Sequence, residues 1–323
     1  MNFKGGKAIS DRLRAKTLEV YSEDDNDEYT LYNLFKNQRS QRIILYGLDK
    51  IIKTYNKKDQ ILELLKNKQN FIAKSFKRGN IILGNSKTIF KNETEAIKNI
   101  AKIYKKDLAK YTTIKPIFNY EGTDIYAISY RFNYFIVQER CFTTLENINF
   151  TQTEFNKFIK EIYESLLILQ KNNFIHNDIK ADNIIKCEGR YKLIDWDLAS
   201  HLDNPFMTLL TGSGGNFVFN HPIKFYSYGM PIFFYKIVYS IYLEYDKSPY
   251  EWLFDLRTFN YIKMVSIKSA NYLINNNCDI NELKKHYDMY SFAILIVFLA
   301  EKNNLKFPAK FVNKLLAPFY IKL

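Results

Sequence analysis

The segment HNDIKADNII, residues 176–185, places polar and charged side chains densely between apolar runs. These residue types suit phosphoryl transfer, which needs neutralised anions, a held metal ion and a positioned hydroxyl nucleophile. Asp178 could accept or orient the hydroxyl proton, and Lys180 could stabilise the phosphoryl group in transfer. Asn183 could hold Mg²⁺ through its amide oxygen. We therefore predict a catalytic loop in this segment.

A second carboxylate lies close behind this segment. Asp195 ends the apolar run of KLIDWDLA, where a strand could aim its side chain. Mg²⁺ prefers oxygen ligands, so Asn183 and Asp195 form the predicted metal pair. An ordinary turn, with Asp178 bonding local N–H groups, is the structural alternative. The succession of all these groups in one stretch disfavours it.

Several elements must position this loop. Residues 151–173 carry a broad apolar face at helical spacing and open with Thr151 and Glu154, a capping-box spacing. Short strands are predicted on either side of the loop, the last two joined by a tight turn at Gly189-Arg190. Farther upstream, 42–76 favours strands, 87–108 a helix and 124–140 a pair of strands.

These motifs together resemble the eukaryotic-type Ser/Thr protein kinases. HNDIKADNII resembles the HRDLKxxN catalytic loop of that family, and IDWDLA resembles its DFG segment. The resemblance implies an α+β, bilobal protein-kinase-like fold with a small β-rich N-lobe and a larger helical C-lobe. It also implies ATP and Mg²⁺ as cofactors, Asp178 as the catalytic base, Lys180 as the phosphoryl stabiliser, and Asn183 and Asp195 as metal ligands.

The resemblance extends upstream of the loop. FIAKSF resembles the strand that carries the ATP-pairing lysine, here Lys74, although this could also be an ordinary strand lysine. NETEAIKNI resembles the helix whose glutamate pairs with that lysine. Glu93 fits this role best, with Glu95 as the alternative. YGLDKIIKTY occupies the place of the glycine-rich phosphate loop and keeps one glycine, Gly47.

Two further segments resemble parts of the same family. In YFIVQERC, Gln138 would be the gatekeeper, and the backbone of Glu139 and Cys141 would meet adenine. YDMYSFAILI resembles the central helix of the large lobe, whose first aspartate, here Asp288, braces the catalytic loop.

The resemblance also implies domain boundaries. We expect a flexible acidic extension over 1–35, an N-lobe over 36–140 and a C-lobe over 141–323. The C-lobe would contain an insertion at about 223–286, because the chain between Pro222 and Asp288 is longer than the family normally has.

The chain also departs from the family pattern. The glycine-rich loop has lost glycines that let backbone N–H groups approach phosphates. Asn177 replaces the arginine that usually pairs with an activation-loop phosphate, which disfavours that mode of regulation. Trp196 and Asp197 replace the last two residues of DFG. His221-Pro222 stands where Ala-Pro-Glu usually ends the segment, and no glutamate follows.

Two other functions stay open. The degraded glycine loop is compatible with a pseudokinase scaffold that has lost turnover. The Asp-Trp-Asp sequence at 195–197 resembles the metal loop of small-molecule phosphotransferases of the antibiotic or choline kinase type. The spacing of Lys180 after Asp178 favours the protein kinases over that second class.

Charge and composition limit the partners. The net charge of +13 favours anionic partners, including an acidic protein substrate, while the dispersed lysines disfavour nucleic acid without excluding it. The N-terminal sequence shows no secretory h-region. Neither of the two longest apolar runs is predicted to span a membrane, because 290–300 is too short and 230–245 is interrupted by Lys236. We expect an intracellular protein, either cytoplasmic or, since its composition resembles kinases of large DNA viruses or AT-rich microbes, in host cytoplasm or a virion. The oligomeric state is not predicted.

Overall fold

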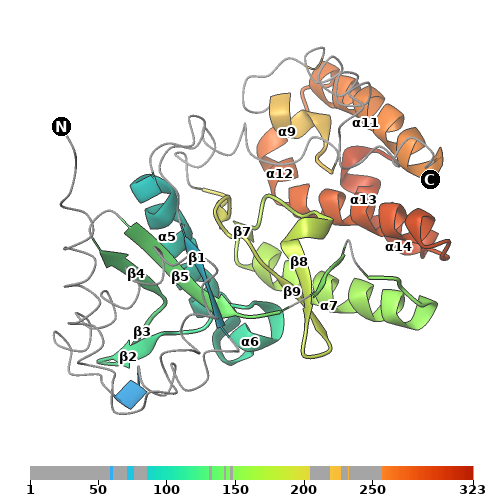
Figure 1. The fold of residues 1–323 in the computed structure, drawn as a ribbon. Coiled ribbons are helices and arrows are strands. Elements are labelled where there is room, and N and C mark those ends of the chain that lie inside the picture. Colours follow the sequence, from blue (N-terminus) through green and yellow to red (C-terminus); the bar gives the residue numbers. More distant parts are fainter. Residues whose placement is uncertain are drawn as a thin grey trace, which may run out of the picture. The chain divides into compact units, whose positions relative to one another are not determined.

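The chain forms two compact units in a computed structural model (Figure 1). The model describes residues 59–60, 71–75, 86–130, 133–141, 143–145, 148–203, 219–226, 232 and 257–322. The first unit holds the described residues up to Lys98 together with Thr113–Cys141, and the second holds Asn99–Thr112 and the described residues from 143 on. The predicted extension over 1–35, the degraded glycine loop and much of the predicted insertion lie outside the described residues.

The first unit is built on an antiparallel sheet. Its strand order is β1 (Phe71–Ser75), β5 (Asn133–Glu139) and β4 (Ala127–Tyr130), and β4 and β5 form the hairpin expected over 124–140. A second hairpin joins β2 (Phe118–Tyr120) to β3 (Thr123–Ile125). The register places Lys74 of β1 opposite Ile136 of β5, which is the middle strand of this sheet.

Helix α5 (Ser86–Tyr104) confirms the helix predicted over 87–108 and ends slightly earlier. Ala96, Ile97 and Ile100 recur at intervals of one to four residues and are buried on one face. The chain continues through the short helices η2 (Lys105–Asp107) and α6 (Leu108–Tyr111).

The second unit begins with two small sheets and a long amphipathic helix. Helix α7 (Gln152–Lys171) starts where predicted, because the Thr151 hydroxyl accepts a hydrogen bond from the Glu154 N–H at 3.3 Å. Strands β6 (Thr143–Thr144), β8 (Ile184–Cys187) and β9 (Arg190–Leu193) form one sheet. Strands β7 (Phe174–Ile175) and β10 (Ser200–His201) form the other.

The turn between β8 and β9 differs from the prediction by one residue. Glu188 and Gly189 are its two central residues, with φ of 50° and 75°, and Arg190 already pairs with Cys187. A two-residue hairpin of this kind needs positive φ at both positions, so the register of the flanking strands moves the turn back by one.

A buried helix forms the centre of the second unit. Residues 287–300 of α13 (Tyr287–Lys302) are all buried, as expected for a helix that is apolar on every side. It contacts α7, α11 (Arg257–Asn275) and α14 (Ala309–Leu316). The shorter helices α9 (Pro222–Tyr226), α12 (Ile280–Lys284) and η6 (Ala317–Phe319) complete this unit. Within the described ranges, no helix combines the length and apolarity needed to cross a membrane.

Candidate active site

The predicted catalytic loop forms one hydrogen-bonded cluster around Asp178, between β7 and β8. Lys180 Nζ donates to Asp178 Oδ2 at 2.7 Å. Asn183 Nδ2 donates to the same oxygen at 2.8 Å and to the Asp178 carbonyl at 2.9 Å. Asp178 and Asn183 are buried, while Lys180 is half-buried. The three residues that the sequence proposed for chemistry in this loop are therefore in contact.

The charge of Lys180 is stabilised by its neighbours. Burial lowers the pKa of the ammonium group, but the carboxylates of Asp178 and, to a lesser extent, Asp195 raise it, and the net pKa lies above the ordinary value. Lys180 is therefore a cation at neutral pH.

The side chain of Asp288 binds the backbone at the start of this loop. The N–H groups of His176 and Asn177 donate to its two carboxylate oxygens at 2.6 and 2.8 Å. Burial raises the pKa of Asp288, and these hydrogen bonds partly oppose the rise. The prediction that Asp288 braces the loop is confirmed.

His176 fixes the loop to the segment that carries Asp195. Its Nε2 lies 3.0 Å from the Ile194 carbonyl oxygen, which can only accept, so Nε2 carries the proton. Burial lowers the pKa of His176, which keeps the ring neutral. The ring also packs on Trp196, whose side chain is fully buried, at a centroid distance of 4.5 Å. His176 thus braces the loop against the segment that carries Asp195.

Asp195 directly follows this anchored position. The N–H of Ile194 donates to the Asn183 carbonyl at 3.0 Å, which ties the two predicted metal ligands to adjoining backbone. Asp195 has a φ of 66°, a left-handed conformation that aspartate tolerates better than most residues. Such backbone geometry often occurs at functional sites, where surrounding structure maintains it.

In the first unit, Lys74 and Glu93 form a close ion pair. Lys74 Nζ donates to both carboxylate oxygens of Glu93, at 3.0 and 2.8 Å. The Glu93 side chain is completely buried, whereas Glu95 is exposed. The structure therefore selects Glu93 over Glu95 as the partner of Lys74.

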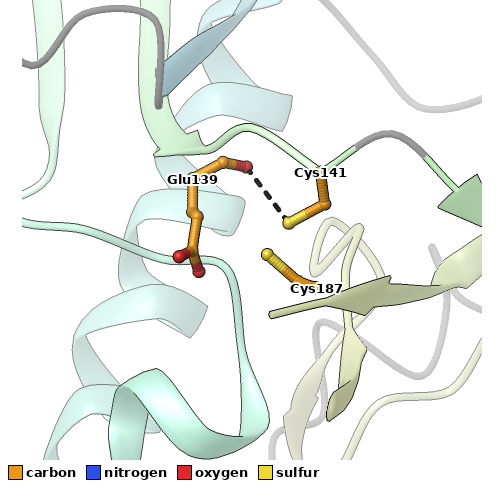
Figure 2. Close-up of side chains that lie close together, drawn as sticks. All are labelled: Glu139, Cys141 and Cys187. Carbon is orange, nitrogen blue, oxygen red and sulfur yellow. Dashed lines mark hydrogen bonds between the residues drawn. The ribbon is translucent and has the colours of Figure 1, made fainter. Parts of the chain in front are cut away.

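The predicted adenine-binding segment lies at the end of strand β5. The side-chain oxygen of Gln138 accepts a hydrogen bond from the Thr113 hydroxyl at 3.2 Å, and the Glu139 N–H donates to the Thr113 carbonyl at 2.7 Å. The sulfur atom of Cys141 lies 3.8 Å from the Glu139 carbonyl oxygen (Figure 2). These contacts join Gln138 and Glu139 to the chain at Thr113, so the backbone at the end of strand β5 is held in place.

Residues 125–215 match the family model of the protein kinase domain. The matched range contains strand β5, helix α7, the Asp178 loop and Asp195. Over these residues the chain is similar to the protein kinases. Its two units, one with a β-sheet and one mainly helical, have the α+β composition of a bilobal kinase fold.

Two known proteins are similar to parts of this chain. A 55-residue stretch is 36% identical to a protein of Acanthamoeba polyphaga mimivirus whose name calls it a serine/threonine-protein kinase; it spans 17% of this chain and 20% of the viral protein. A chain in the crystal structure of the yeast RNA polymerase II CTD kinase CTDK-1 complex is also similar, with a TM-score of 0.33 and 16% identity. That likeness covers 49% of this chain and 48% of the yeast chain.

One predicted site residue is not described by the structure, and one residue that contacts the loop was not predicted from the sequence. Gly47 lies outside the described residues, so its predicted contact with phosphates stays a prediction. Conversely, the sequence pattern did not single out Lys224, a buried lysine whose Nζ donates to the Asn177 carbonyl at 2.7 Å. Lysines are rarely buried, and this one lies far along the chain from the loop that it contacts.

Proposed function

We propose that this protein kinase transfers the γ-phosphate of ATP to serine or threonine hydroxyls of proteins, with Mg²⁺ as the metal cofactor. The observation that supports it most is the convergence of Lys180 and Asn183 on one carboxylate oxygen of Asp178, in a loop braced by Asp288. The Lys180 spacing, two residues after Asp178, resembles the Ser/Thr branch of the superfamily.

The proposed roles follow from the charges in the cluster. Asp178 would orient the substrate hydroxyl and accept its proton. Lys180 would stabilise the phosphoryl group, because it is a cation held beside that carboxylate. In the first unit, Lys74 would contact the α- and β-phosphates, and the buried Glu93 would keep its ammonium group in position. The Glu139 and Cys141 backbone would bind adenine, and Gly47 would allow close approach to the phosphates.

The predicted metal ligands fit Mg²⁺ in chemistry. Asn183 uses its amide nitrogen as a donor to Asp178, so its side-chain oxygen is the atom suited to a cation. Asp195 contributes a carboxylate from backbone tied to Asn183. Both would be oxygen ligands, which Mg²⁺ prefers. When bound, the ion would neutralise charge on the phosphate chain.

The proposed substrate class follows from surface charge and family. The superfamily implies a protein substrate, and the net charge of +13 supports acidic sequences around the acceptor hydroxyl. Such a preference should weaken as salt screens the attraction.

The test is phosphate transfer from labelled ATP, with serine, threonine and tyrosine peptides and small alcohols as parallel acceptors. We expect transfer to serine or threonine peptides, and a loss of at least about a thousandfold in kcat for Asp178→Asn. Asp182→Asn, four residues along in the same loop, is the matched control and should stay near wild type. Transfer to small alcohols alone would instead identify a small-molecule phosphotransferase. Nucleotide binding without any transfer would identify a pseudokinase.

A further inference from the structure

Two lysines are fully buried near the catalytic loop in the second unit. Lys224, in helix α9, and Lys263, in helix α11, are 1% and 0% exposed. Both contact Asn220: Lys224 Nζ donates to its side-chain oxygen, and Lys263 Nζ donates to its carbonyl, each at 2.9 Å. The two lysines therefore share burial and a polar neighbour.

Their contacts with the catalytic loop differ. Lys224 Nζ also donates to the Asn177 carbonyl at 2.7 Å, while the Asn177 N–H donates to Asp288 at 2.8 Å. Asn177 is thus held at both of its backbone polar groups, each by a buried charged side chain. Because Asn177 immediately precedes Asp178, these two bonds constrain the backbone that carries the proposed base.

The electrostatic environment supports a charged Lys224. Burial lowers its pKa to about 8, and the carboxylates of Asp178 and Asp288 act against that fall. The group is therefore mostly protonated at neutral pH. A buried ammonium is costly unless it is well bonded, so its retention here calls for a structural or functional role.

We propose that Lys224 is a positioning residue: it ties helix α9 to the Asn177 carbonyl and so holds Asp178 in place for the phosphate transfer proposed above, on which this inference rests. In the protein kinases that this chain resembles, the position of Asn177 is usually an arginine, which pairs with a phosphate on the activation loop. Lys224 supplies a cation from within the folded chain at the same point, so the tie needs no phosphorylated residue.

The first test measures the effect of the hydrogen bond between Lys224 and the Asn177 carbonyl, called the tie below, and it does not require enzymatic activity. Hydrogen exchange would be followed by mass spectrometry in the full chain, for peptides that cover 174–181, in Lys224→Met and in the matched control Lys263→Met. We expect exchange at least about tenfold faster in Lys224→Met than in the control, as for loss of a hydrogen bond to a charged group. Lys224→Arg should remain closer to wild type, because it keeps the charge and the donors.

A kinetic test then links the tie to catalysis. We expect Lys224→Met to lower kcat about tenfold or more, with the KM for ATP changed by less than about threefold, whereas Lys263→Met should largely retain kcat at equal fractions folded. Equal exchange in the two variants, or equal kcat, would overturn the proposal. An inactive wild type would refute the proposed function, yet the exchange comparison would still report on the tie.

A second experiment that does not use Lys224→Met covers the case in which that variant does not fold. Wild-type exchange at 174–181 would be compared at pH 7 and pH 9.5, after correction for intrinsic exchange rates. Loss of the Lys224 charge should speed exchange at the higher pH, with Lys224→Arg insensitive over this range. An unchanged corrected rate in the wild type would count against the tie.

Discussion

The backbone N–H of His176 donates a 2.6 Å hydrogen bond to a carboxylate oxygen of Asp288, 112 positions farther along the chain. The neighbouring N–H of Asn177 bonds the other oxygen. One side chain at the start of the central helix α13 thus satisfies two successive N–H groups just before Asp178. The course of the proposed catalytic loop therefore depends on the core of the second unit as well as on its own sequence.

Asp288→Asn should destabilise the protein by about 1–3 kcal/mol, because one of the two N–H groups would then face an amide donor. Urea unfolding would measure this loss. Asp279→Asn is the matched control, since Asp279 caps the exposed start of helix α12 and asparagine caps equally well. A loss in Asp288→Asn no greater than in the control would show that the brace contributes little to stability.

The Lys74–Glu93 pair should be energetically coupled far more strongly than a surface pair. A double-mutant cycle with Lys74→Met and Glu93→Gln should give a coupling of about 1–3 kcal/mol, because Lys74→Met removes the ammonium group that donates to both oxygens of a buried carboxylate. The comparison pair is Lys110–Glu164. Its Nζ and Oε2 atoms are 3.4 Å apart, and the two side chains are 34% and 37% exposed. Its coupling should be below about 1 kcal/mol. Similar couplings for both pairs would contradict the prediction.

Nucleotide should stabilise the protein in a Mg²⁺-dependent way. ATP with Mg²⁺ should raise the Tm more than ATP with EDTA, since ligands that bind the folded state stabilise it by mass action. Asp195→Asn should remove most of the Mg²⁺-dependent increment while leaving the shift from ATP alone. Asp203→Asn, on the exposed turn after strand β10, is the control and should retain the full increment. A full increment in Asp195→Asn would exclude Asp195 as a metal ligand.

Stability should depend on pH through Lys263. Burial lowers its pKa to about 7, below the ordinary value of 10.5, so the unfolded chain binds more protons between these values. The free energy of unfolding of the wild type, relative to Lys263→Met, should therefore be lowest below pH 7 and rise as the pH increases to about 10. The slope should reach at most about 1.4 kcal/mol per pH unit.

The control for this pH dependence is Lys268→Met, on the exposed face of the same helix α11. Its stability relative to the wild type gives the baseline for removing an exposed lysine from the same helix. Denaturant unfolding at several pH values would measure both differences. Parallel curves for Lys263→Met and the wild type would show that the buried lysine does not titrate as its surroundings indicate.

Local patterns in the sequence were sufficient for the elements and for the cluster around Asp178. The start of helix α7 at Thr151 depends on contacts within one turn, and Lys180 and Asn183 reach Asp178 because they lie two and five positions away. Where the outcome depended on the register of two strands, as in the turn at Glu188-Gly189, the sequence prediction was wrong by one residue.

The sequence by itself determined the family resemblance, the position of the proposed catalytic loop and the candidate partners of Lys74. Only the tertiary structure decided between Glu93 and Glu95, because the choice depends on which side of helix α5 is buried against the rest of the fold. It alone revealed Lys224 at the Asn177 carbonyl, 47 positions away, since no short-range pattern records a contact made by packing. Short-range geometry follows from residue spacing, whereas the environment of a buried charge is a property of the whole fold.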